Sequence, residues 1–282
     1  MFAVPLIALL SDFGVIDTYV GSMKGVISNI SPGIPMIDLT HEIPPGDIRR
    51  GAISLWKELP YFPPKTIFLC IIDPGVGTSR RGILVKSGDF YFIGPDNGLF
   101  SYVLEPGAEV WQLKNPDYQL PEVFTTFHGR DIFAPAAAHL ARGISPKKFG
   151  PPLSDPVLIP YPRMEARESN SLLGEILYSD RYGNLLTSLG RFHRRGEEID
   201  LIEPWVPGSL QARYKVDKMR IRLLDGTILP WVNTFDEVGE GQCAILLGSS
   251  GLIEIVAKRE SAEILLGISN GEIITMGEFG DP

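Results

Sequence analysis

The order of apolar and polar residues in the first half of the chain alternates between two patterns. Continuous apolar runs such as TIFLCII are typical of strands buried on both faces of a parallel sheet. Between these runs, apolar side chains recur at helical spacing. The expected strands are residues 4–10, 35–39, 66–72, 82–86 and 90–93, the last two as a hairpin-like pair, and the expected helices are 17–29, 47–59 and 132–142. This alternation predicts a layered α/β domain with a largely parallel sheet.

The second half of the chain is patterned differently. Its apolar runs are short, rich in β-formers and separated by Gly, Asn and Asp, which favours a small β-barrel-like domain. The runs are 172–178, 185–189, 218–223, 244–248 and 252–256. We therefore expect an N-terminal α/β domain at 1–152, a linker at 153–170 and a C-terminal β-barrel domain at 171–282.

Composition and charge exclude several classes of protein. Of 282 residues, 44% are hydrophobic and 21% charged, which is ordinary for a folded globular chain. The net charge of -8 argues against nucleic acid as a partner. No apolar run approaches the roughly 18 residues that span a bilayer, so we expect no membrane partner and a cytoplasmic location. Cys70 and Cys243 each lie in an apolar run and are expected to be buried free thiols.

Polar clusters occur where the predicted strands end. Asp12 follows the first strand, and Asp73 follows the TIFLCII strand and opens the stretch DPGVGTSRR. His128 lies in FHGRD, just before a predicted helix. Ligands of open α/β sheets bind beyond the carboxyl ends of the parallel strands. An acid, arginines and a histidine at one such edge can bind, orient and deprotonate a water molecule.

Each of these residues also has a purely structural interpretation. Asp12 can be a turn former, Asp17 the N-cap of the helix at 17–29, and His41 a turn residue. In the second half, Asp180 and Asn184 can simply build a β-turn. The Gly-rich stretch after Asp73 lacks the P-loop pattern, so a nucleotide phosphate site is only weakly indicated there.

Five motifs taken together resemble one family across nearly the whole chain. It is the family of adenosine-forming S-adenosylmethionine (SAM) hydrolases, also called SAM hydroxide adenosyltransferases, which are related to fluorinases and chlorinases. The motifs are SDFGVIDTYVGSMKGVI at 11–27, IDPGVGTSRR at 72–81, IGPDNGLF at 93–100, TFHGRDIFAPAAAHL at 126–140 and DRYGNLLT at 180–187.

The resemblance implies a fold, an assembly and a catalytic set. The fold is an N-terminal α/β domain and a smaller C-terminal β-barrel, in a homotrimer whose sites lie at subunit interfaces. The hydrolases carry an Asp, an Arg seven residues later and a His, which map to Asp73, Arg80 and His128. The halogenases typically carry aromatic residues at the acid and histidine positions, so the resemblance favours hydrolysis.

The resemblance also implies residues that hold the substrate. Asp12 would accept hydrogen bonds from both ribose hydroxyls, and Ser249 would contact the methionine carboxylate, although Ser250 stands where halogenases have an arginine. The implied substrate-binding residues are Asp12, Asp17 and Asp180 (the latter two for the methionine ammonium), Tyr182 and Asn184 (adenine), Ser249, and Arg259 through its backbone.

The expected reaction is metal-independent hydrolysis of SAM to adenosine and L-methionine, with no cofactor. Water or hydroxide attacks C5′, and methionine leaves as a neutral thioether, so neither a general acid nor a metal is required. Arg80 is expected to stabilise hydroxide, while Asp73 and His128 accept hydrogen bonds from the water. The alternatives are a SAM-dependent halogenase, a metal-dependent phosphoesterase using Asp12, Asp73, Asn97 and His128, and a non-catalytic SAM or adenosine sensor.

Overall fold

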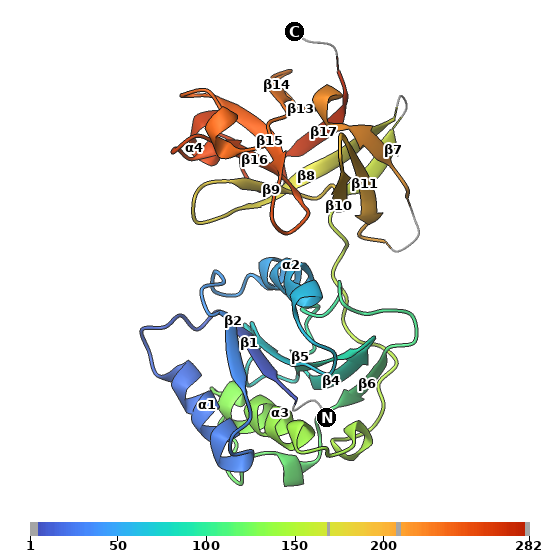
Figure 1. Cartoon of the computed structure of the whole chain (residues 1–282). Coiled ribbons are helices and arrows are strands. Elements are labelled where there is room, and N and C mark those ends of the chain that lie inside the picture. Colours follow the sequence, from blue (N-terminus) through green and yellow to red (C-terminus); the bar gives the residue numbers. More distant parts are fainter. Residues whose placement is uncertain (1–4, 168–169, 207–209, 280–282) are drawn as a thin grey trace. The chain divides into compact units, whose positions relative to one another are not determined.

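The computed structural model describes residues 5–167, 170–206 and 210–279. The chain forms two compact units, residues 1–160 and 161–282 (Figure 1). No helix among the described residues combines the length and apolar character needed to cross a membrane.

The N-terminal unit is built on a six-stranded sheet with the order β2-β1-β3-β5-β4-β6. Strands β2, β1, β3 and β5 run parallel, whereas β4 pairs antiparallel with both β5 and β6. The sheet is therefore mixed: three of its five pairings are parallel, and β4 and β5 form the hairpin expected for residues 82–86 and 90–93. Only residues 88–89 separate β4 from β5, and so short a turn joins antiparallel strands. The strands are β1 (Ile7–Ser11), β2 (Met36–Thr40), β3 (Ile67–Ile71), β4 (Gly82–Ser87), β5 (Phe90–Pro95) and β6 (Glu109–Gln112).

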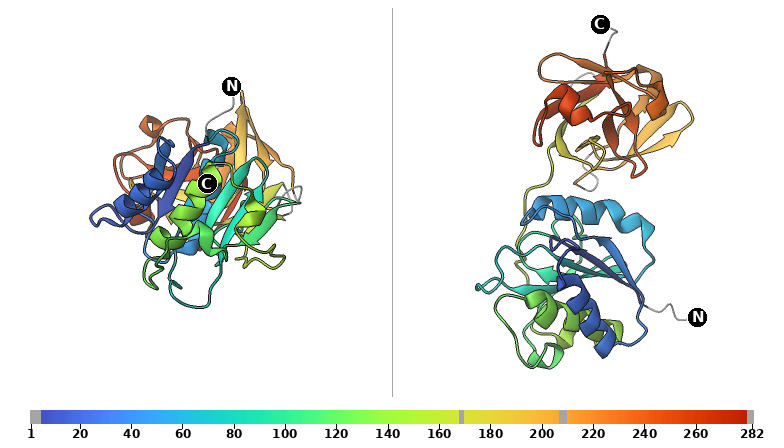
Figure 2. Two further views of the ribbon diagram at one scale, coloured as in Figure 1. Left: turned by 90° about the horizontal axis from the view of Figure 1, so that it is seen from below. Right: turned by 90° about the vertical axis from the view of Figure 1, so that its left-hand side faces the viewer.

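Helices cover both faces of this sheet. Helices α1 (Tyr19–Ile30) and α3 (Ala134–Ala141) pack side by side on one face, and α2 (Ile48–Glu58) lies on the other (Figures 1 and 2). Asp47 caps α2 by accepting a hydrogen bond from the Arg50 amide at 2.9 Å. The N-cap of α1 is Thr18, so the structural interpretation of Asp17 as the cap is wrong.

The core of the N-terminal unit follows from the predicted apolar runs. Strands β1 and β3 are buried along their whole length because helices cover both of their faces. Their side chains pack with the inner faces of α1 and α3. Fully buried members of this core are Ile7, Leu9, Met23, Ile27, Leu69, Phe133 and Ala137. Cys70 is also buried and Cys243 is half-buried, and both are free thiols.

The C-terminal unit is almost entirely β-structure. Its eight-stranded antiparallel sheet has the order β14-β13-β17-β8-β9-β16-β15, with β7 paired to β8. A bridge between Trp231 and Ile245 brings the two edges together, so the sheet is a nearly closed barrel. A second sheet contains β10-β11-β12. The elements are β7 (Met164–Arg167), β8 (Ser171–Ser179), β9 (Leu185–Thr187), β10 (Arg191–Arg195), β11 (Glu198–Glu203), β12 (Arg213–Lys215), β13 (Met219–Arg222), β14 (Ile228–Pro230), β15 (Cys243–Leu247), β16 (Ile253–Ala257), α4 (Ala262–Leu266) and β17 (Ile273–Glu278).

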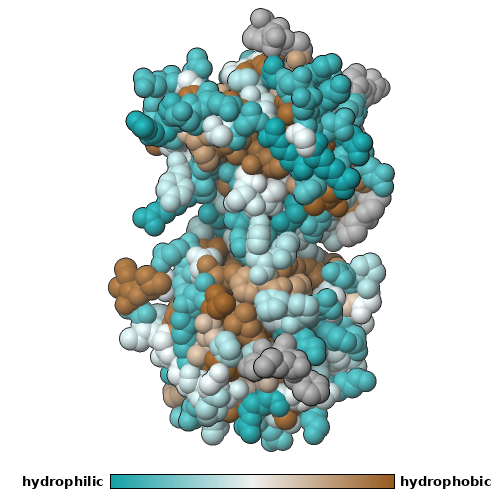
Figure 3. Space-filling view, viewed as in Figure 1, coloured by the Kyte–Doolittle hydropathy of each residue, from teal (hydrophilic) through white to brown (hydrophobic). Residues whose placement is uncertain are grey.

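The segment between the two sheets is fastened to its neighbours. The amides of Val157 and Ile159 donate to Asp96 Oδ1 at 2.8 Å and to Ser101 Oγ at 2.9 Å. Five residues after Ile159, β7 begins and joins the C-terminal sheet. On the surface of both units, hydrophobic side chains are interspersed among hydrophilic ones (Figure 3).

Candidate active site

The parallel strands bring the predicted polar residues to one edge of the sheet. Ser11 is in register with Ile71, so β1 and β3 end level with one another. Asp12 and Asp73 follow these ends, and Asn97 follows the end of β5. The convergence expected from the sequence is therefore present for these three residues.

The loop from Asp73 to Arg80 turns back on itself. The Thr78 hydroxyl donates to the Gly75 carbonyl at 2.7 Å, and the Val76 amide donates to the Asp73 carbonyl at 3.2 Å. Gly77 has a φ of +77°, and a Cβ atom there would lie 2.5 Å from the Thr125 carbonyl oxygen. Only glycine fits this turn, which brings Arg80 back to the acid at the start of the loop.

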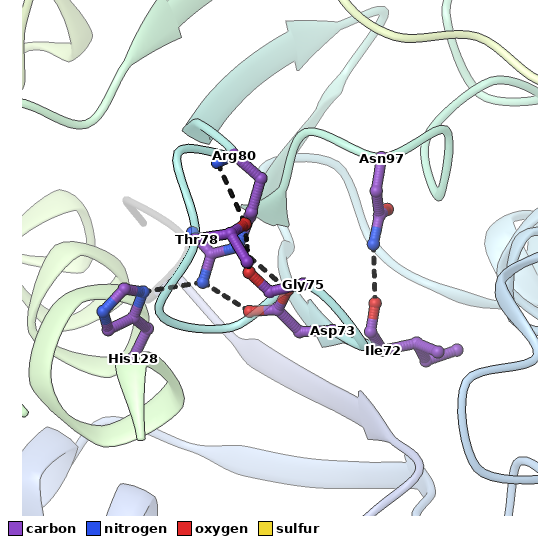
Figure 4. Close-up of polar contacts among 7 residues, drawn as sticks. All are labelled: Ile72, Asp73, Gly75, Thr78, Arg80, Asn97 and His128. Carbon is purple, nitrogen blue, oxygen red and sulfur yellow. Dashed lines mark hydrogen bonds and ion pairs between the residues drawn. The ribbon is translucent and has the colours of Figure 1, made fainter. Parts of the chain in front are cut away.

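Asp73, Arg80 and His128 form one connected cluster (Figure 4). Arg80 Nε donates to Asp73 Oδ1 at 2.8 Å, and Arg80 Nη2 donates to Asp73 Oδ2. The same Nη2 lies 2.7 Å from His128 Nδ1. The side chains of Arg80 and Asp73 are only 11% and 5% exposed, so this two-pronged ion pair is largely shielded from water.

The contact with Arg80 determines the protonation of His128. A guanidinium nitrogen can only donate, so His128 Nδ1 must accept and carries no proton. The ring is then neutral, with its proton on Nε2. Burial and the positive charge of Arg80 lower the pKa of His128, while Asp73 and Asp131 oppose them weakly. In this arrangement His128 Nε2 carries the ring proton and can donate a hydrogen bond.

A cavity of about 150 Å³ opens beside this cluster. Its polar side chains include Asp73 and His128, and its apolar wall includes the rings of Phe13, Tyr19 and Phe127. These rings pack against one another with centroids 5.1–5.9 Å apart. This volume is below the roughly 300–1,000 Å³ of pockets that enclose a drug-sized ligand.

Sequence reasoning gave no positioning role to the residues that hold the cluster in place. Asp131 is fully buried, is paired with Arg130, and accepts from the Phe124 amide at 2.8 Å, which fixes the loop that carries His128. Asn97 Nδ2 donates to the Ile72 carbonyl at 2.8 Å, directly before Asp73 (Figure 4). The adjacent Arg130 and Asp131 in FHGRD were the sequence signal available for this pair.

The other predicted residues of the N-terminal unit lie at the same edge but are used differently. Asp12 Oδ2 accepts from the Gly46 amide at 2.8 Å, and its side chain is half-buried. Asp17 is exposed and has no hydrogen-bond or ionic partner among the described residues. A carboxylate that is not occupied in capping is available to a cationic group.

In the C-terminal unit, Asp180 builds the turn that carries Tyr182 and Asn184. Asp180 Oδ1 accepts from the amides of Tyr182 and Asn184 at 2.8 and 2.9 Å, and Oδ2 accepts from Asn184 Nδ2 at 3.0 Å. The turn interpretation of Asp180 and Asn184 is thus confirmed. Tyr182 is 76% exposed, so the turn presents a free aromatic face.

Ser249 and Arg259 lie beyond opposite ends of β16. Ser249 is exposed in the hairpin loop between β15 and β16, and Arg259 is exposed after β16 with a φ of +59°. The turn with Tyr182 lies at the Arg259 end, because Gly183 touches Ser261. Ser250 is buried, and its carbonyl accepts from Arg191 Nη1 at 2.8 Å.

The described residues contain no group of three or more His, Cys, Asp or Glu side chains placed to hold a metal ion. Asn97 points to a backbone carbonyl, and both Asp73 oxygens face Arg80. The four residues considered for a metal-dependent phosphoesterase therefore do not form a ligand set.

The fold and the cluster define an α/β unit with an acid–arginine–histidine site, followed by a barrel-like unit. Two family models match this arrangement: the SAM hydroxide adenosyltransferase N-terminal domain at residues 7–150 and the C-terminal domain at 174–275. The chain belongs to the SAM hydroxide adenosyltransferase family.

Individual relatives agree with this assignment. The chain is 38% identical over 273 residues to a Thermus thermophilus protein named (R)-S-adenosyl-L-methionine hydrolase, covering 93% of this chain and 95% of the relative. It is 28% identical to an Actinoplanes fluorinase, covering 89% and 90%. A crystal structure of an uncharacterized conserved protein from Thermotoga maritima is similar, with a TM-score of 0.83, 31% identity and coverage of 96% and 100%.

Proposed function

We propose that the protein hydrolyses S-adenosyl-L-methionine to adenosine and L-methionine. The observation that carries this proposal is the complete Asp73–Arg80–His128 cluster, in which Asp73 and His128 line the cavity. Hydrolases of this name are more similar to the chain than the fluorinase is, at 38% against 28% identity.

The reaction balances without a cofactor. The water oxygen forms a bond to C5′ while the C5′–sulfur bond breaks, and the bonding electrons pass to sulfur. The positively charged sulfonium becomes the neutral thioether of methionine. The new oxygen centre loses one proton to give the 5′-hydroxyl of adenosine.

The cluster acts mainly by orienting the water, and less by stabilising hydroxide. Asp73 already neutralises Arg80, so the arginine is not a free cation for hydroxide. The Asp73 oxygens retain lone pairs that can accept from water, and His128 Nε2–H can donate to it. Arg80 Nη1 has no hydrogen-bond partner among the described residues and is a second available donor.

Asp73 is the proton acceptor in this proposal. A carboxylate is only a weak base. A weak base is sufficient here, because a water oxygen bonded to C5′ becomes strongly acidic as the bond forms. The proton is transferred late in the step, and no hydroxide needs to form beforehand.

The substrate contacts remain proposals. Asp12 would bind the ribose diol, and Asp17 and Asp180 the methionine ammonium. Tyr182 would pack on adenine, with Asn184 and the Arg259 backbone at its edge, and Ser249 would contact the carboxylate. A homotrimer with sites at subunit interfaces and a cytoplasmic location also stay predictions.

The test is product analysis with purified protein and SAM. We expect adenosine and methionine in equal amounts, unchanged by a chelator, and loss of both in Asp73→Ala. Formation of a 5′-halo-5′-deoxyadenosine in chloride or fluoride would favour the halogenase. Tight binding without products would favour the sensor, and either result would overturn the proposal.

The name of the relatives also specifies the substrate epimer. Sulfur in SAM carries three different carbon groups and is a stereocentre. We extend the (R) preference of the named relatives to this chain. Separated sulfonium epimers should differ in kcat/KM, with the (R) form faster, and equal rates would contradict this extension.

A further inference from the structure

A buried histidine outside the cluster connects the loop that carries Asp12 to the neighbouring strand. Thr40, the last residue of β2, is paired with Leu10 of β1, so His41 lies beside Ser11. Ser11 Oγ and His41 Nδ1 are 2.7 Å apart, and the two residues are 0% and 4% exposed. The sequence suggested only a turn residue at position 41.

His41 holds this loop at two points. Its side chain binds Ser11, and its backbone carbonyl accepts from the Gly14 amide at 2.8 Å. Asp12 lies between these two contacts and is itself held by the Gly46 amide. The direction of the Asp12 carboxylate therefore depends on where His41 stands.

An ion pair lies behind the histidine. His41 Nε2 is 3.0 Å from Asp38 Oδ1, and Lys24 Nζ donates to Asp38 Oδ2 at 2.6 Å. The ring N–H is not well aligned with the carboxylate, so the contact is electrostatic rather than a hydrogen bond. Burial works to raise the pKa of Asp38, but its contacts with Lys24 and His41 outweigh burial and lower it. The carboxylate favours a proton on Nε2, which leaves Nδ1 to accept from the Ser11 hydroxyl.

Ser11, His41 and Asp38 have the composition of a catalytic triad, but they cannot act as one. A nucleophilic hydroxyl must be reachable by substrate, and Ser11 is fully buried. Its hydroxyl is also committed to the ring and accepts from the Phe13 amide at 3.3 Å. The arrangement holds a loop in place rather than attacking a substrate.

We propose that His41 is a positioning residue that orients Asp12 toward the ribose diol of the substrate. This inference rests on the proposed function, because it assumes that Asp12 binds a nucleoside. It assigns the Lys24–Asp38–His41–Ser11 chain to substrate affinity, separate from the Asp73–Arg80–His128 cluster that acts on the water.

The test compares binding of adenosine and 2′,3′-dideoxyadenosine by calorimetry. The two ligands differ only in the diol, so their affinity ratio measures the Asp12 contact. A carboxylate that binds a diol should give the wild type a ratio of about tenfold or more. Asp12→Asn should reduce that ratio. A wild-type ratio near one would contradict the proposed role of Asp12 itself.

The His41 variants then test the inference alone. The amide oxygen of Asn can occupy the place of Nδ1 and accept from the Ser11 hydroxyl, whereas the amide of Gln reaches the place of Nε2. His41→Asn should keep most of the diol ratio, and His41→Gln and His41→Leu should reduce it to about threefold or less. KM for SAM should rise at least several-fold in the last two variants, with a smaller change in kcat.

The matched control is His139→Leu, which removes a half-buried histidine of α3 that packs on Tyr118. It should leave the diol ratio unchanged. If His41→Leu does not fold, His41→Gln carries the test. A folded His41→Gln protein that discriminates the two nucleosides as well as the wild type would overturn the inference, even with the Asp12 contact intact.

Discussion

Substituting Arg80 by lysine separates the geometry of the cluster from its charge. Arg80 makes three hydrogen bonds, two to Asp73 and one to His128. A lysine ammonium in the same place keeps the positive charge but matches only one of these partners well. Two lost bonds at about 1.5 kcal/mol each give about 3 kcal/mol. If this energy orients Asp73 and His128 for the water, kcat should fall about 150-fold.

The assay measures adenosine release at saturating SAM, and chromatography quantifies the adenosine. The control is Arg81→Lys, because the adjacent Arg81 pairs with Asp96 and Asp155 and is not part of the Asp73–Arg80–His128 cluster. We expect Arg81→Lys to stay within about threefold of the wild type. An Arg80→Lys protein with normal thermal unfolding and a kcat within threefold of the wild type would refute the reasoning, since charge alone would then suffice.

Two further predictions concern the loop and the histidine. Gly77→Ala should lower the stability of the N-terminal unit by about 2 kcal/mol more than Gly107→Ala. Both glycines have a positive φ, but only at Gly77 would the added Cβ meet a carbonyl oxygen, at 2.5 Å. Equal shifts in thermal unfolding for the two variants would contradict this prediction. Because burial and Arg80 lower the pKa of His128 from 6.5, the unfolded chain binds more protons just below pH 6.5, and stability should fall as the pH drops from 6.5 toward the folded-state pKa. The pKa of His139 is lowered as well, so this loss of stability at low pH should be smaller in both His128→Asn and His139→Leu. Thermal unfolding across pH measures it, and an unchanged pH dependence in His128→Asn would contradict the prediction.

The sequence predicted the buried strands well, because β1 and β3 are apolar on both faces and leave a continuous signal. It missed strands such as β10 (RFHRR) and β11 (EIDLIE), where charged residues interrupt the apolar pattern. It predicted the hairpin of β4 and β5, because only a short turn separates the two apolar runs. The strand β6 and its antiparallel pairing with β4 were not predicted.

The candidate site was predicted in part. Resemblance to a family indicated Asp73, Arg80 and His128, and the structure brings them into contact. Their hydrogen-bond roles could not be predicted, because the protonation of His128 depends on how two distant loops meet. The role of His41 was missed for the same reason: its partner Ser11 is thirty residues away and gives no local signal.

The antiparallel direction of β4 affects how the residues of the Asp73–Arg80–His128 cluster can change during evolution. β3 ends and β4 begins at the same edge of the sheet, and the connection passes the end of β5, where the Asp96 amide donates to the Arg81 carbonyl at 2.9 Å. Asp73 and Arg80 therefore lie on one short loop that never crosses a face of the sheet. Such a loop can be replaced as a unit, which exchanges Asp73 and Arg80 and leaves the strands and their order unchanged. The Asp73–Arg80–His128 cluster can therefore be altered through this one loop and the residue at position 128, without repacking the sheet.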